Sequence, residues 1–320
     1  MVPDSISDLI AARSAQIIET RRFFHGIPEL GFEENETGKA IADRLTAAGL
    51  AVETGIGKTG LVAVLEGAKP GPRLMIRADI DGLPVDELTG LDFASTNGRM
   101  HACGHDGHIT MAVTAAEILA AMKDQLAGTL IFVFQPAEEV VMGALAMIDD
   151  GLFEKYPADR VIGTHLWNQI PTGTIGVNRA TVFASADQFR LTVHGKGGHG
   201  AMPHKTIDPV AAIAEIITTA QTVVSREVPP NEMGVLTFGQ IHGGSAPNVI
   251  ADSVTVEGTV RAYTAETRIL IMRALERIAN NVAAAMRATT SFERIHGAPP
   301  VINDPEVAAW VTRQASLVVG

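Results

Sequence analysis

The densest group of residues able to bind a metal ion or to transfer a proton lies between His101 and His108. Five such side chains fall within eight positions of the sequence His101-Ala-Cys103-Gly-His105-Asp106-Gly-His108. A thiolate and an imidazole two residues apart, on backbone that Gly104 keeps flexible, can bind the same cation without strain. The structural alternative is a buried thiol, with Asp106 capping the helix that follows. Taken alone, the cluster favours a metal site over this alternative.

A pair of adjacent carboxylates, Glu138 and Glu139, follows the apolar run Thr129 to Phe134 within the sequence Gln135-Pro-Ala-Glu-Glu. Open α/β sheets place their sites at the carboxyl ends of strands. Neighbouring side chains point in different directions, so one carboxylate can bind a metal while the other faces the substrate and carries a proton. The equally weighted alternative is a solvated helix start, where acidic residues are favoured.

Two further strand ends carry groups of the same kind. Asp79 and Asp81 follow the apolar run Leu74 to Ile76 and face the same side, where such carboxylates often orient a ligand histidine. His165 ends another apolar run, within Gly163-Thr-His-Leu-Trp. Each feature alone also fits a polar loop or a structural histidine. Three strand ends that offer ligands of one type together predict a metal site.

Polar residues in the later part of the chain suit substrate binding. His199 lies in the glycine-rich segment 195–204, whose glycines allow close approach to a ligand, although a flexible hairpin loop has the same composition. Asn248 follows another glycine-containing stretch, and Arg261 lies on an expected strand. The Arg261 guanidinium can pair with a substrate carboxylate or make a structural ion pair, and the sequence leaves both open.

The elements that must position these residues alternate between helices and strands in the first part of the chain. Apolar spacing and bracketing glycine or proline residues predict an α/β layer structure with a mostly parallel sheet. The expected helices are Ser5 to Phe24, Glu36 to Ala48, Gly107 to Met122 and Gly143 to Asp150, and the expected strands are Leu61 to Leu65, Leu74 to Ile76, Thr129 to Phe134 and Val161 to Leu166.

After Trp167 the pattern changes to that of a small α+β sandwich, with two helices on one face of an antiparallel, ferredoxin-like sheet. We therefore expect a first part of a catalytic domain at 1–180, an inserted domain at 181–290 and a return to the catalytic domain at 291–320. The expected strands are Gly173 to Val177, Gln188 to His194, Gly234 to Ile241, Ser253 to Ala262 and Ser291 to Ile295, and the expected helices are Asp208 to Arg226, Ala265 to Met286 and Asp304 to Leu317.

The composition excludes several classes of protein. The 320 residues carry a net charge of −11, and a surface this acidic should repel the phosphates of nucleic acids. The single cysteine, Cys103, favours a reducing cytoplasm. We see no signal peptide and no apolar run of the length that a membrane span needs.

Six motifs, taken in order along the chain, resemble the M20 metallopeptidase family. They are residues 77–84, 101–108, 135–139, 163–167, 195–203 and 243–248. The resemblance is closest to its N-acyl-amino-acid amidohydrolases, which include hippurate hydrolases and hydrolases of plant auxin conjugates. It runs from about Arg22 to the end, and the sequences HACGHDGH and QPAEE are specific. It implies a zinc-peptidase-like catalytic domain, an inserted dimerisation or lid domain, a homodimer, and a site with two divalent metal ions such as manganese, zinc, cobalt or nickel.

Residue roles follow from the same resemblance. Glu138 matches the family's general base, Asp81 a carboxylate beside the metals, and His199 a lid residue that stabilises the oxyanion. Asn248 and Arg261 correspond to residues that hold the substrate. The residues that match metal ligands are Cys103, His105, Glu139 and His165.

One feature departs from the family pattern. The family has a further closing segment that supplies a last histidine ligand, and the surroundings of His296 do not match it. We therefore expect either a truncated copy of a longer enzyme or an impaired second metal position.

Three functions compete on these observations. The leading hypothesis is metal-dependent hydrolysis of the amide in N-acyl or N-aroyl amino acids, which are small-molecule substrates. The second is a catalytically impaired dimer that binds metal or ligand. The third, a hydrolase with Cys103 as nucleophile, needs an activated and accessible thiolate and is disfavoured because Cys103 lies among expected ligands.

Overall fold

The computed structural model describes residues 4–319, which divide by their internal contacts into two compact units. Unit 1 contains residues up to Gly176 and those from Thr312 onward, and unit 2 runs from Val177 to Val311. The second boundary lies later than the expected residue 291. The reason is that β12 (Thr289–Ala298) pairs with β7 (Ala186–His194) and so belongs to the sheet of unit 2.

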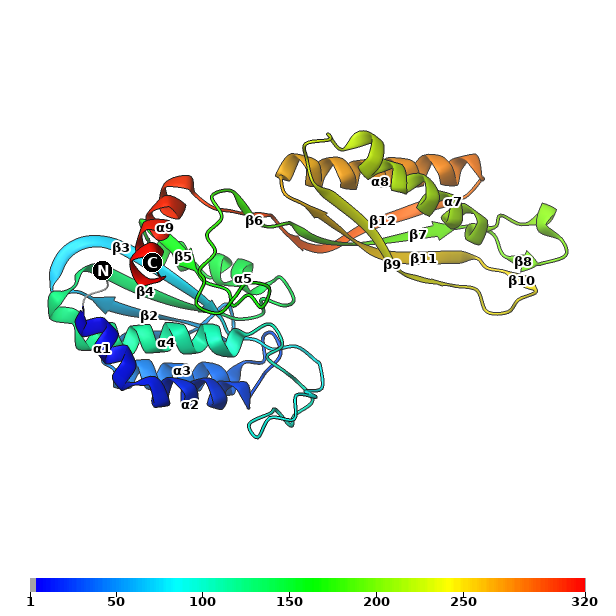
Figure 1. Ribbon diagram of the computed structural model, residues 1–320. Helices are drawn as coiled ribbons and strands as arrows, with labels where there is room; N and C mark the ends of the chain where they lie inside the picture. Colours follow the sequence, from blue (N-terminus) through cyan, green and yellow to red (C-terminus); the bar gives the residue numbers. More distant parts are fainter. Residues whose placement is uncertain (1–3, 320) are drawn as a thin grey trace. The chain divides into compact units, whose positions relative to one another are not determined.

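Unit 1 is built on a five-stranded sheet with the order β1-β2-β4-β3-β5 (Figure 1). β3 runs parallel to both β4 and β5, while the β1–β2 and β2–β4 pairs are antiparallel. The sheet is therefore mixed. The expectation of a mostly parallel sheet was wrong for the edge formed by β1 and β2, where a short connection joins the two strands as an antiparallel hairpin. The strands are β1 (Ala51–Ile56), β2 (Gly60–Glu66), β3 (Lys69–Asp79), β4 (Ala127–Gln135) and β5 (Arg160–Gly163).

Helices cover both faces of this sheet. α2, α3 and α4 pack on one face, where Phe24, Ile41 and Ile109 are fully buried against the strands. On the other face Met147 of α5 and Leu152 of α6 pack against the sheet. The helices are α1 (Asp4–Ala12), α2 (Ser14–His25), α3 (Asn35–Ala47), α4 (His105–Ala121), η1 (Lys123–Gln125), α5 (Gly143–Asp149) and α6 (Leu152–Lys155).

Strand β2 contributes side chains to the cores on both faces of the sheet. Successive side chains along a strand point to opposite faces, so Leu61 and Leu65 enter the core under α2 to α4 while Val62 enters the other. The expected helix at Ser5 to Phe24 is two helices, because the chain is interrupted at Arg13 between α1 and α2.

Unit 2 is a four-stranded antiparallel sheet with the order β12-β7-β11-β9, and α7 and α8 pack against it around one core. The order β-α-β-β-α-β is ferredoxin-like, as expected from the sequence. The expected strand at Gly173 to Val177 is absent, because residues 173–177 have no regular structure. The remaining elements are β6 (Thr181–Phe183), β8 (Gly198–His199), η2 (Pro203–Lys205), α7 (Pro209–Thr222), η3 (Val223–Glu227), β9 (Gly234–Gly243), β10 (Val249–Ile250), β11 (Ser253–Ala262), α8 (Ala265–Ala285), β13 (Val301–Ile302) and α9 (Pro305–Val319).

Among residues 4–319, no helix combines the length and the apolar character needed to cross a membrane.

Candidate metal centre

The candidate site lies where the three parallel strands of unit 1 end. β3, β4 and β5 end at Asp79, Gln135 and Gly163, and their carboxyl ends meet at one edge of the sheet. α4, which connects β3 to β4, begins at this edge with His105. The loops after the strands therefore bring together the motifs that the sequence analysis singled out.

Gly104 is the turn that joins the first two candidate ligands. Its φ of 86° is in the left-handed region that favours glycine, and it is the N-cap of α4. The turn brings Cys103 and His105 into one cluster, in which Cys103 Sγ lies 3.5 Å from His165 Nε2. His105 Nε2 lies 3.8 Å from Glu139 Oε1.

Asp81 fixes both His105 and Glu139 without taking part in the cluster. The backbone carbonyl of Asp81 accepts a hydrogen bond of 2.8 Å from His105 Nδ1, and its Oδ1 lies 3.2 Å from the same nitrogen. A proton is therefore on Nδ1, and Nε2 is the nitrogen that faces the cluster. Asp81 Oδ2 accepts a hydrogen bond of 2.9 Å from the backbone N–H of Glu139. Asp81 thus orients the candidate metal ligands His105 and Glu139 through hydrogen bonds, without itself binding the metal.

The residues fit a divalent cation. His105 Nε2 and Glu139 Oε1 are buried and, among the described residues, have no hydrogen-bond partner. Buried polar atoms are almost always partnered, so two such atoms facing one cluster call for a ligand. The set of thiolate, imidazole and carboxylate suits zinc, manganese, cobalt or nickel. Cys103, His105, Glu139 and His165 could hold the metal.

Charge interactions within the cluster favour the ligating form of the thiol. The nearby rings of His105 and His165 lower the pKa of Cys103, and the contact with Cys103 raises the pKa of His165. Although burial opposes it, contacts with Asp81 and Cys103 and the charge of Asp79 raise the pKa of His105 to about 11. Burial raises the pKa of Glu139. A thiolate is the form of cysteine that binds metal.

Other residues of the 101–108 motif have different partners. His108 Nδ1 contacts Asp79 and its Nε2 accepts a hydrogen bond from the backbone of Leu166. His101 is buried, which lowers its pKa to about 4. Asp106 lies inside α4 and does not cap it; its Oδ2 contacts the ring of His25 at 2.8 Å.

Sequence reasoning missed one buried carboxylate, Glu34. Its Oε1 accepts a 2.7 Å hydrogen bond from the backbone N–H of Ala137, directly before the glutamate pair, and its Oε2 accepts one from Thr59. Ala137 has a φ of 49°. The one sequence signal was an acidic residue at a helix start, which is commonplace.

The structure places the remaining predicted residues in unit 2. His199 on β8 pairs with Val249 on β10, and the carbonyl of Asn248 accepts a hydrogen bond from Gly200. His199 and Asn248 are therefore neighbours. Arg261 is near the far end of β11, roughly 25 Å along the strand from its start at Ser253.

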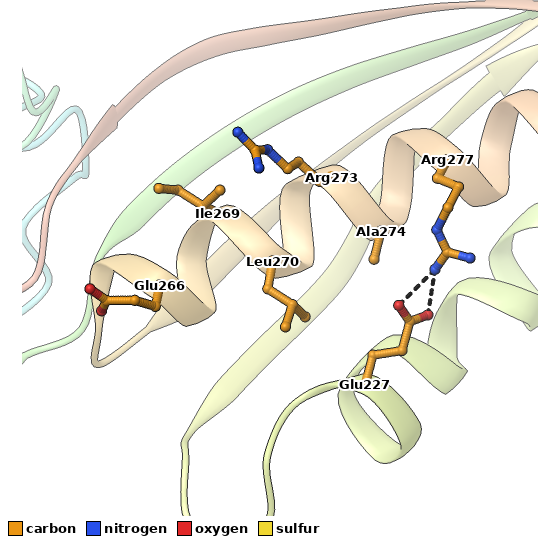
Figure 2. A pocket seen from close by; sticks show the side chains of 7 residues that line it. All are labelled: Glu227, Glu266, Ile269, Leu270, Arg273, Ala274 and Arg277. Atoms are coloured by element: carbon orange, nitrogen blue, oxygen red, sulfur yellow. Dashed lines mark hydrogen bonds and ion pairs between the residues drawn. The ribbon is translucent and has the colours of Figure 1, made fainter.

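A separate shallow depression lies in unit 2 along α8 (Figure 2). An ion pair between Arg277 and Glu227 spans one end of it. None of the seven residues that line it is a cysteine or a histidine, so it does not share the chemistry of the cluster in unit 1.

Comparison with known proteins supports the family resemblance that the sequence motifs indicate. A model of the family described as peptidase family M20/M25/M40 matches residues 75–320. The N-acyl-L-amino acid amidohydrolase of Geobacillus stearothermophilus is 39% identical over 96% of this chain and 83% of its own length. The N-acetyldiaminopimelate deacetylase of Streptococcus sanguinis is 42% identical over 91% of this chain and 78% of its own length.

A solved structure agrees with these relatives. The Bacillus subtilis YXEP protein, a dinuclear metal binding peptidase from the M20 family, superimposes with a TM-score of 0.82 at 34% identity, over 96% of this chain and 80% of that one. Because the family model covers most of the chain and the fold agrees along its length, this chain belongs to peptidase family M20/M25/M40 and is a hydrolase of the amidohydrolase group.

Proposed function

We propose that this protein hydrolyses the amide bond of N-acyl and N-aroyl amino acids, including hippurate-like substrates, to a carboxylic acid and a free amino acid. The observation that carries the proposal is a pair of groups that share His105, one with Cys103 and His165 and one with Glu138 and Glu139. Glu138 remains partly exposed beside them. The relatives named for acyl and acetyl amino acids support the substrate class.

The metal ions, when bound, lower the pKa of water toward about 7 and polarise the amide carbonyl. Glu138 is the general base in this proposal. Its Oε2 lies 3.9 Å from His105 Nε2, and 40% of its side chain is exposed, so it can reach both the cluster and an incoming substrate. It accepts a proton from the attacking water and later donates it to the leaving nitrogen.

Asp81 and Glu139 have two further roles in this proposal, orientation of a ligand and binding of the metal. Asp81 keeps the proton of His105 on Nδ1, so that Nε2 faces the cluster. The Glu139 carboxylate points to the buried side, while its neighbour Glu138 stays accessible. Adjacent carboxylates in different surroundings can thus perform different tasks.

Unit 2 supplies the substrate-binding groups in this proposal. Arg261 Nη1 is buried and has no hydrogen-bond partner among the described residues, so it can pair with a substrate carboxylate. His199 stabilises the oxyanion, and Asn248 beside it holds the substrate. Arg261 lies near the end of β11, whereas Asn248 lies in the segment before the start of β11 at Ser253. One copy therefore does not bring both to one small molecule, which supports our prediction of a homodimer with unit 2 as lid. The single cysteine supports a cytoplasmic location.

The test is product release from a panel of N-acetyl and N-benzoyl amino acids by the metal-loaded chain, with the free amino acid measured by mass spectrometry. We expect release by the wild type, none after chelation with EDTA, and none from Glu138→Gln with its metal content unchanged. Glu154→Gln, at an exposed position of α6, is the matched control and should keep full activity. Release that survives EDTA would indicate thiol catalysis by Cys103. No release from any substrate would favour a binding protein, and unchanged release by Glu138→Gln would refute the assigned base.

A further inference from the structure

His108 uses both of its ring nitrogens inside the protein. A backbone N–H can only donate, so the 2.8 Å contact between Leu166 N and His108 Nε2 makes Nε2 the acceptor. The ring proton is then on Nδ1, which donates to Asp79 Oδ1 at 2.5 Å. Both residues are buried. In this arrangement His108 has no nitrogen left to bind a metal, although it is the last residue of the 101–108 motif and lies beside Asp79 and His105.

The partner of His108 is the residue that orients His165. The carbonyl oxygen of Leu166 accepts a 2.6 Å hydrogen bond from His165 Nδ1. That bond leaves His165 Nε2 facing Cys103 Sγ. Leu166 therefore accepts a hydrogen bond from His165 on its carbonyl oxygen, while its backbone N–H donates to His108. The rings of His108 and His165 also pack edge to face, with centroids 4.7 Å apart.

The segment that carries His165 needs such support. β5 ends at Gly163, and residues 164–167 have no regular secondary structure. The Leu166 side chain lies against the first turn of α4, at the two glycines of the motif. A Cβ added to Gly107 would lie 2.4 Å from Leu166 Cδ1, and one added to Gly104 would lie 3.4 Å from it. The glycines therefore make room for Leu166 where His108 holds its backbone.

Asp79, which accepts the hydrogen bond from His108, is itself held in place by other residues. It is fully buried at the end of β3, and its Oδ2 accepts a 2.6 Å hydrogen bond from Arg77. Arg77 in turn donates to Gln135 Oε1 at the end of β4, at 2.9 Å. A continuous series of hydrogen bonds thus runs from the ends of two sheet strands through His108 to the loop after the third.

We propose that His108 is a positioning residue, which holds the backbone of Leu166 so that His165 points its Nε2 at Cys103 and at the metal. The inference rests on the proposed metal site, but it concerns metal affinity and not the substrate. Outer partners of metal ligands typically contribute 10- to 100-fold to affinity, because they fix the orientation of the ligand.

Two substitutions of His108 separate its two hydrogen bonds. In His108→Asn the side-chain amide can replace Nδ1 as the donor to Asp79, but no acceptor reaches Leu166. In His108→Gln the longer side chain can place its oxygen near the position of Nε2 and accept from Leu166. The measurement is the Zn²⁺ dissociation constant of the full chain, from competition with a chromogenic chelator, together with the thermal midpoint of the metal-free protein. Neither readout needs a substrate, so failure of the proposed amidohydrolase activity would not affect it.

We expect His108→Asn to bind Zn²⁺ about 10- to 100-fold more weakly than the wild type and His108→Gln to recover most of that loss. Equal loss in the two variants, or wild-type affinity in both, would overturn the proposal. Loss of one whole ion from both would make His108 a ligand and would also overturn it. Gly107→Ala keeps the proposal testable if His108→Asn does not fold. Alanine favours the helix, so stability should not fall, yet its Cβ displaces Leu166 and should weaken Zn²⁺ binding several-fold. Unchanged Zn²⁺ affinity in folded Gly107→Ala would count against the proposal.

Discussion

Glu34 provides the sharpest test of how the glutamate pair is held in place. Its carboxylate is fully buried and accepts hydrogen bonds from the backbone of Ala137 and from Thr59. Ala137 precedes Glu138 and has a positive φ, so the turn depends on this partner. Glu34→Ala removes the acceptor, whereas Glu34→Gln keeps an oxygen that can still accept from Ala137.

The loss in the free energy of unfolding expected for Glu34→Ala can be estimated from the interactions that the substitution removes. The buried N–H of Ala137 loses its partner, at about 1–3 kcal/mol. One methylene group is lost, which contributes about 0.8 kcal/mol. The Thr59 hydroxyl also loses its acceptor, at about 1 kcal/mol. Burial raises the pKa of Glu34, so removing a disfavoured charge offsets part of the loss. We expect a net destabilisation of about 2–4 kcal/mol for Glu34→Ala and about 1 kcal/mol for Glu34→Gln, which keeps the hydrogen bond in neutral form.

Urea unfolding at neutral pH, followed by circular dichroism, measures both free energies of unfolding. Displacement of the Ala137 turn also moves Glu138, and a misplacement of about 1 Å can cost roughly 100-fold in rate. The turnover of Glu34→Ala should therefore fall by about that factor under conditions where the protein remains folded. An alanine variant within 0.5 kcal/mol of the wild type, or one with unchanged turnover, would refute the reasoning.

Two further predictions concern the pH dependence of Glu34 and a buried ion pair in unit 2. The folded-state pKa of Glu34 is raised above its ordinary value of 4.5, so the folded state retains the proton longer than the unfolded state. The free energy of unfolding of the wild type, relative to Glu34→Gln, should fall as pH rises from 4.5 through the raised pKa and then level off; a rise over that range would contradict this sign. In unit 2, Arg268 makes two hydrogen bonds, of 2.6 and 2.8 Å, to the fully buried Asp187. Arg268→Ala should cost about 3–5 kcal/mol in urea unfolding, and more than Arg294→Ala, whose more exposed side chain makes one contact with the same carboxylate. An equal loss of unfolding free energy in Arg268→Ala and Arg294→Ala would contradict this prediction.

The proximity of Cys103, His105, Glu139 and His165 could be predicted from the sequence because these residues coincide with strong local patterns. Cys103 and His105 stand at a helix start marked by glycine, and Glu139 and His165 follow clear apolar strands. Parallel strands carry such ends to one edge of the sheet, so the order of elements alone brings distant residues together. The ferredoxin-like unit was predictable for the same reason, since its order of strands and helices is distinctive.

Other features depend on contacts that no local pattern carries. Glu34 meets Ala137 across 103 positions of sequence, and nothing near Glu34 indicates that partner. His108 has the same residue type as the ligands, and its different task follows from which N–H group the packing of Leu166 brings to it. The end of unit 2 was placed too early because a strand pattern over residues 291–295 does not say which sheet the strand joins.

The measurement that tests the account most directly is the number of divalent metal ions bound per chain, by elemental mass spectrometry after gel filtration. Wild-type protein should carry about two ions, as expected from the dinuclear relative, and His105→Ala should carry fewer than one. His105 is the choice because it belongs to every group of candidate ligands at the site, and its buried Nε2 has no hydrogen-bond partner among residues 4–319. Metal-free wild-type protein, or equal metal content in His105→Ala, would contradict the assignment of this cluster as the catalytic metal centre.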